Sequence, residues 1–181
     1  MKNKQEQLEL FKLPNASKAV LQLIQEQELC PEAQMKLFGL PDAPNVILRY
    51  AKRFTLCDEA QVKMFELPNV DKIIYEYSVH AFCTLTDYAR VKMFDLPNAA
   101  QVVLEFVELE PLCDEGQIKM FELPNANEVV WRYIKNWILC TEAQRKVFEL
   151  SRGKDIICKY AQRHPLTEEI KQLYYATYGA H

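Results

Sequence analysis

Residues 56–69, which read LCDEAQVKMFELPN, decide the fold because close copies of this stretch recur along the whole chain. Its final tripeptide, Leu-Pro-Asn, returns in intact or degenerate form at intervals of 27, 27, 29, 27 and 27 residues. The six copies begin at Leu13, Leu40, Leu67, Leu96, Leu123 and Leu150. A fixed period of this length is typical of stacked repeats, since one repeat cannot bury its apolar face alone.

Each repeat, numbered from a leucine such as Leu56, predicts two short helices. Positions 5, 9 and 12 of the first helix, which are Ala60, Met64 and Leu67, fall on one side at helical spacing. This helix should begin at the Cys or Thr of position 2 and end before the proline, which disfavours helical geometry in the preceding residue. The next residue should cap the second helix through its side-chain oxygen. These predicted caps are Asn15, Asp42, Asn69, Asn98 and Asn125.

The pattern therefore predicts an all-α protein, a right-handed α-α superhelix, or solenoid, of about 6.5 tandem two-helix repeats of 27 residues. We expect a single α-solenoid domain over residues 1–181. The predicted repeats span residues 2–28, 29–55, 56–84, 85–111, 112–138 and 139–165, followed by a C-terminal capping helix in 166–181.

In organisation the chain resembles the α-solenoid superclass of helical-hairpin repeats, which includes tetratricopeptide, HEAT and armadillo proteins. Its recurring Leu-Cys-Asp-Glu-Ala-Gln followed by Leu-Pro-Asn is also similar to 27-residue repeats in uncharacterised bacterial proteins. The resemblance covers nearly the whole chain. It implies the fold and brings no assigned activity.

Composition narrows the class of partner. The 181 residues are 49% apolar and 26% charged, which is ordinary for a soluble globular protein. A net charge of −3 provides no general field for attracting phosphate backbones or anionic membranes. Residues 1–7 lack the apolar stretch of a secretory signal. We therefore expect a cytoplasmic protein with a protein or peptide partner, rather than a nucleic acid or a membrane.

The cysteines are the first candidates for chemistry. Four of them share position 2, namely Cys30, Cys57, Cys113 and Cys140. Equivalent residues of stacked helices lie about 8–10 Å apart, too far for a disulfide or a shared zinc ion. We interpret the slot as a cap or core position, with a reactive thiol at a helix N-terminus as the alternative.

The two other cysteines lie outside this slot. Cys158 replaces an apolar residue at position 20 and is predicted to be in the core. Cys83 and His80 lie in the segment 78–84, where this repeat carries two extra residues. No other metal-ligating pair is nearby in sequence, and two ligands are too few for a closed zinc site. Because no nucleophile, base and oxyanion-donor set is evident either, we expect no enzyme activity, no cofactor and no metal.

The second helix carries the variable part of each repeat. Positions 17, 21 and 24 form one polar stripe whose residues change from repeat to repeat, as in an extended binding surface or an unconstrained solvent face. The candidate partner-binding residues in this stripe are Arg49, Lys52, Glu76, Glu105, Glu108, Arg132, Lys135 and Lys159.

We therefore predict a non-enzymatic scaffold that docks a protein or peptide along this stripe. The alternative is a nucleic-acid-binding helical repeat array, which reads one nucleotide per helix pair through such fixed positions. The charges disfavour this alternative, because a surface that binds nucleic acid should be basic. The stripe holds seven basic and five acidic residues, and we expect Glu105 and Glu108 to form an uncompensated acidic patch.

Aromatic residues gather towards the C-terminus. They are Trp131, Trp137, Tyr174, Tyr175 and Tyr178. Core and cap packing is one interpretation of this cluster. A patch for a partner or for self-association is the other, since aromatic side chains are enriched at interface hot spots.

Overall fold

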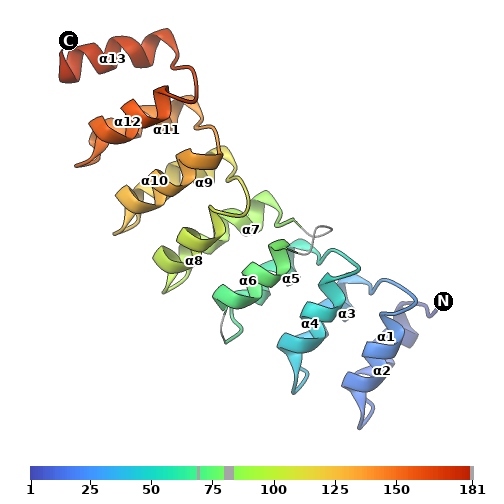
Figure 1. Cartoon of the computed structure of the whole chain (residues 1–181). Helices are drawn as coiled ribbons and strands as arrows, with labels where there is room; N and C mark the ends of the chain where they lie inside the picture. Colours follow the sequence, from blue (N-terminus) through green and yellow to red (C-terminus); the bar gives the residue numbers. More distant parts are fainter. Residues whose placement is uncertain (69, 80–83, 180–181) are drawn as a thin grey trace. The chain divides into compact units, whose positions relative to one another are not determined.

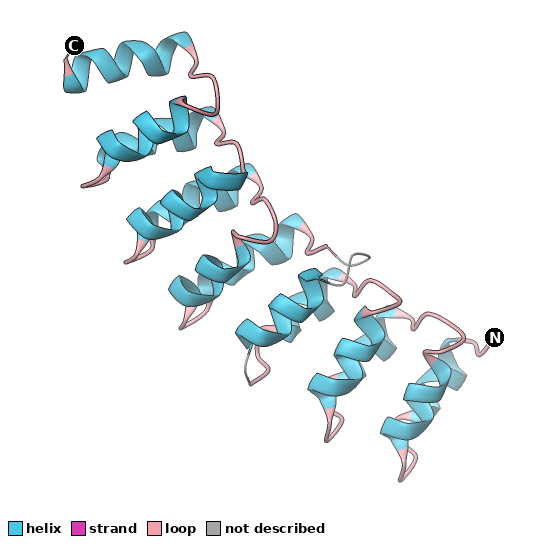
Figure 2. Ribbon diagram, viewed as in Figure 1, coloured by secondary structure: helices cyan, strands magenta, loops and turns pink. Residues whose placement is uncertain are grey.

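The computed structural model describes residues 1–68, 70–79 and 84–179. In this part of the chain the fold is all-α, with 13 α-helices, three short 3-10 segments and no strand (Figure 2). The predicted cap Asn69 and the insertion with His80 and Cys83 lie outside the described residues.

The chain divides into two compact units, Met1–Ala89 and Arg90–His181. The helices of the first unit are α1 (Lys4–Leu10), α2 (Ala16–Leu23), α3 (Pro31–Leu37), α4 (Ala43–Ala51), α5 (Asp58–Met64) and α6 (Val70–Val79). Helix α7 (Asp87–Lys92) spans the boundary between the units. The second unit contains η1 (Met93–Asp95), α8 (Ala99–Phe106), α9 (Asp114–Lys119), η2 (Met120–Glu122), α10 (Ala126–Asn136), α11 (Thr141–Lys146), η3 (Val147–Glu149), α12 (Gly153–Ala161) and α13 (Glu168–Tyr178).

Within each unit the helices pack against their equivalents in the neighbouring pair (Figure 1). In the first unit α1, α3 and α5 pack in series, and α2, α4 and α6 form a second series. In the second unit α9, α11 and α13 form one series and α8, α10 and α12 the other. Each unit is therefore repeat-like, with a layer of first helices and a layer of second helices.

The predicted boundaries of the first helices follow from local sequence. Pro31 occupies the first turn of α3, where its missing N–H costs nothing. Leu96 and Leu123, which precede the prolines, have extended backbone with ψ of 145°. The steric effect of proline on the preceding residue agrees with both, and the predicted end of the first helix before the proline is confirmed. Leu150, which precedes Ser151, has the same extended backbone with ψ of 146°, so the repeat reaches this conformation without proline as well.

The predicted side-chain caps of the second helices are wrong. Asn15, Asp42, Asn98 and Asn125 stand at the N-cap positions, but none of these four described side chains makes a capping hydrogen bond. A residue that caps a helix through its side chain has extended backbone. These four residues do not, as the angles of Asp42 show (φ −113°, ψ 32°), so their side chains are not aimed at the first-turn N–H groups. Two of them bridge neighbouring pairs instead: Asn125 Nδ2 donates to the Ala100 carbonyl at 3.0 Å, and the Asp42 carboxylate accepts from the Ser17 hydroxyl.

The core lies between the two layers of helices. Ala60 and Met64 are fully buried, as the apolar side of the first helix predicts, whereas Leu67 lies beyond the end of α5 and is half-buried. The second helices contribute fully buried tyrosines, Tyr50, Tyr77, Tyr133 and Tyr160. Among the described residues, no helix is long and apolar enough to cross a membrane.

Candidate interaction surfaces

The eight predicted partner-binding residues all reach solvent. Each lies in a second helix or within two residues of its end. The exposed ones are Arg49, Lys52, Glu108 and Lys135, and the half-buried ones are Glu76, Glu105, Arg132 and Lys159. The stripe is thus an accessible face of the second-helix layer in each unit.

In the second unit the stripe is mixed in charge, with three basic and four acidic residues, and Arg132 pairs with two of its carboxylates. Arg132 bridges two helices, with its guanidinium 2.8 Å from Glu108 Oε1 and 2.9 Å from Glu128 Oε1. The hydrogen bond to Glu128, followed by that to Glu108, raises the pKa of Arg132. Glu105 accepts a hydrogen bond from Gln101 at 2.5 Å. The expectation of a wholly uncompensated patch at Glu105 and Glu108 is therefore wrong for Glu108, whose basic partner comes from the next second helix, 24 residues away, while Glu105 makes no ion pair with a described residue.

In the first unit the stripe is basic and largely unpaired. Lys18, Arg49, Lys52 and Lys72 stand there with a single acidic residue, Glu76. Arg49 donates a long hydrogen bond of 3.4 Å to Asn45, and in the described chain none of these four basic residues makes an ion pair. Because α2, α4 and α6 pack in series, the four side chains belong to one surface.

Buried glutamines at position 6 link successive helix pairs, and the sequence interpretation missed them. Gln34 Oε1 accepts from the Cys57 backbone N–H at 2.6 Å, while Gln34 Nε2 donates to the Leu29 carbonyl and the Tyr50 hydroxyl, both at 3.0 Å. The same link to the next pair is made by Gln7, Gln61 and Gln117. A polar residue recurring next to the buried position 5 was the available signal.

These links explain the cysteine slot. The glutamine binds the backbone N–H of position 2, so the slot accepts Cys57 or Thr86 alike. Cys30, Cys57, Cys113 and Cys140 are free and half-buried, and burial raises the pKa of the Cys57 thiol. This supports a structural slot over a reactive one. Across residues 1–68, 70–79 and 84–179, no group of three or more metal-ligating side chains occurs.

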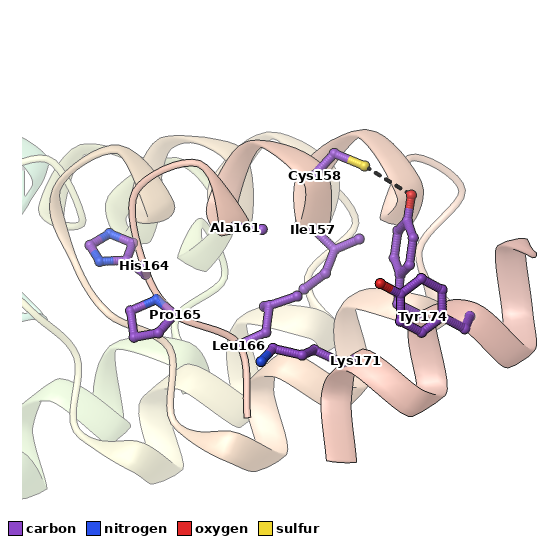
Figure 3. Close-up of a pocket in the computed structure, with 9 residues that line it drawn as sticks. Ile157, Cys158, Ala161, His164, Pro165, Leu166, Lys171 and Tyr174 are labelled. Atoms are coloured by element: carbon purple, nitrogen blue, oxygen red, sulfur yellow. Dashed lines mark hydrogen bonds between the residues drawn. The ribbon is translucent and has the colours of Figure 1, made fainter. Parts of the chain in front are cut away.

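A groove of about 490 Å³ lies between α12 and α13 (Figure 3). Its lining comes from Ile157, Cys158 and Ala161 of α12, from His164, Pro165 and Leu166 of the connection, and from Lys171, Tyr174 and Tyr175 of α13. The Cys158 thiol lies 3.4 Å from the Tyr174 hydroxyl, and this contact raises the pKa of that phenol. Cys158 is exposed, so its predicted core position is wrong.

The aromatic cluster predicted near the C-terminus divides into two parts. Trp137 is tied into the fold by a 2.8 Å hydrogen bond from Nε1 to the Val107 carbonyl, and Arg152 lies over the ring of Trp131. Tyr174 and Tyr175 instead line the groove, with Tyr175 55% exposed. Of the five predicted aromatic residues Tyr175 alone is exposed, and the other four, Tyr178 included, are half-buried.

Comparison with family models, with curated protein sequences and with solved structures yields no match.

Proposed function

We propose that the protein is a non-enzymatic interaction scaffold, a right-handed α-solenoid of 27-residue repeats that binds a protein or peptide along the stripe of its second helices. The solenoid is supported by the serial packing of equivalent helices within each unit and by the glutamine links that recur from pair to pair. Such arrays commonly present an extended surface to a partner.

The observation that carries this proposal is the contrast between the two stripes. The first-unit stripe carries four basic residues and one acidic residue, whereas the second-unit stripe carries three basic and four acidic ones. The four cations of the first unit make no ion pair with any described residue, while Arg132 of the second unit is held between two carboxylates. Unpaired cations on adjacent helices attract an acidic segment and repel a basic one. The partner is therefore a protein or peptide with acidic side chains at the contact.

The strength of this contact follows from its exposure. A single exposed ion pair contributes about 0 to 1 kcal/mol, so several must act together, and salt weakens each of them. Loss of two of the four cations should reduce binding at low ionic strength by about tenfold or more, which corresponds to about 1.4 kcal/mol.

The test is fluorescence anisotropy with a labelled glutamate-rich peptide at low and moderate salt. We expect the double variant Arg49→Glu/Lys52→Glu to lose binding. Lys36→Glu is the matched control, because Lys36 is exposed on α3 of the same unit but lies outside the stripe. Equal binding by the double variant and the control would exclude the stripe. Stronger binding of a labelled single-stranded oligonucleotide, with a steep dependence on salt, would favour the nucleic-acid array instead.

A further inference from the structure

The second helices cover one another in series, and α12 is the exception in the second unit. Helix α4 covers α2, α6 covers α4, α10 covers α8 and α12 covers α10. In the described part of the chain no second helix packs on the far side of α12. That side forms one wall of the groove against α13 (Figure 3).

The exposure of position 23 of the repeat distinguishes α12 from the covered second helices. In the pairs of α2, α4, α8 and α10 this position is buried, with exposed fractions of 2% or less at Ile24, Ala51, Val107 and Ile134, and at Ser78 of α6 it is half-buried. At Ala161 of α12 the equivalent residue is exposed. The face of α12 is thus the same kind of helix-packing surface as the others, without its cover.

The groove combines an apolar floor with a basic rim. Ile157 is fully buried at its base, beside Leu166 of the connection. Lys171 stands at the rim, and none of the nine lining residues has a carboxylate. Lys171 contacts one carboxylate outside the lining, that of Glu168 at 2.5 Å, but both side chains are largely exposed, at 46% and 82%, so Lys171 remains accessible to a second carboxylate. An apolar occupant with acidic side chains at its edge matches this arrangement.

We propose that the groove between α12 and α13 is a docking site for an amphipathic, acidic helix of a partner protein. The α10–α12 interface indicates the occupant, because there the equivalent face of α10 is covered by the next second helix, α12. That helix has buried apolar residues at i, i+1 and i+4, namely Ile156, Ile157 and Tyr160, and the occupant of the groove should have the same pattern. Its carboxylates lie towards Lys171. This site is separate from the stripe of the first unit and does not depend on it.

The probe is a fluorescein-labelled peptide of residues 98–110 of this chain, which has the second-helix pattern and acidic residues at its C-terminal end. A staple across the positions of Gln101 and Glu105 keeps it helical, since a free helix of this length is marginal in water. We expect saturable binding to the full protein, and a slower reaction of Cys158 with a disulfide reagent when the peptide is bound.

Two variants locate the binding. Ala161→Asp should lower affinity at least tenfold, because it places a carboxylate against the apolar face of the peptide. Ala176→Asp should leave affinity unchanged, since Ala176 is exposed on α13 but does not line the groove. Circular dichroism checks that both variants keep their helix content. The stripe variant Arg49→Glu/Lys52→Glu should also bind this peptide normally, which separates the groove from the proposed function.

Three results would overturn the proposal. One is the absence of saturable binding, and another is an equal effect of the two alanine variants. The third is a dimer in light scattering that Ala161→Asp dissociates, because the occupant would then be a second copy of this chain.

Discussion

Gln34 and Cys57 belong to successive helix pairs, and the side-chain oxygen of Gln34 accepts a hydrogen bond from the Cys57 backbone N–H at 2.6 Å. The same glutamine also satisfies the Leu29 carbonyl and the Tyr50 hydroxyl. One buried amide therefore joins the start of its own first helix, its own second helix and the next pair.

Replacing this amide should lower stability. Gln34→Leu keeps a similar volume but leaves the Cys57 N–H and its other partners without a hydrogen bond, so the free energy of unfolding should fall by about 1 to 3 kcal/mol. Urea unfolding followed by circular dichroism measures this. Gln22→Leu, at an exposed site of α2, should change stability by less than about 0.5 kcal/mol. Equal effects of the two changes would show that the link contributes nothing.

The ion pair of Arg90 and Glu110 should behave as a mutually dependent pair. Arg90 takes the glutamine position, and Glu110 takes a position occupied by Phe54 and Trp137 in other repeats. Their side chains are 15% and 10% exposed and lie 3.0 Å apart. Arg90→Gln alone leaves a buried carboxylate without its cation and should cost about 3 to 5 kcal/mol. The double variant Arg90→Gln/Glu110→Phe should recover most of this in thermal unfolding, and additive losses would contradict the coupling.

Gly153 should not tolerate a methyl group. A Cβ at this position would lie 2.2 Å from the Val147 carbonyl oxygen and 2.9 Å from the Tyr178 hydroxyl. Gly153→Ala should therefore destabilise the second unit by about 1 to 3 kcal/mol. At Gly39 a Cβ would meet only the Lys36 carbonyl oxygen, at 3.6 Å, so Gly39→Ala should be neutral or slightly stabilising. Calorimetric melting temperatures compare the two, and a neutral Gly153→Ala would disprove the close approach.

Alkaline pH should destabilise the fold through its buried phenols. Burial raises the pKa of Tyr133 and of Tyr160. A phenol whose pKa is higher in the folded state stabilises the fold below its unfolded pKa of about 10, and this contribution is lost as the pH rises towards the folded pKa. Unfolding free energies should therefore fall above about pH 10. Tyr133→Phe should show a shallower fall, and an unchanged slope would contradict the assignment.

Local sequence was sufficient for the helix pairs. The apolar spacing of Ala60 and Met64 predicts a buried first helix, and the proline after Leu67 predicts its end, because both effects act within one or two turns. The exposure of stripe residues such as Arg49 also agrees with the helical period.

The predictions that failed involve partners distant in sequence. Asn125 was expected to cap its own helix but bonds to Ala100, 25 residues away, and Glu108 was expected to be unpaired but meets Arg132, 24 residues away. Cys158 was expected to be buried, although its exposure depends on whether another helix covers α12.

The amino-acid sequence by itself thus determined that this chain forms short helices in pairs and which of their faces are apolar. Only the tertiary structure decided which stripe charges are neutralised, what the glutamine of position 6 binds, and where a groove stays open between α12 and α13. The physical reason is the distance along the chain over which each interaction acts. Helix period and proline sterics act over a few residues, whereas ion pairs, buried amides and grooves depend on which atoms of neighbouring pairs come within a few ångströms.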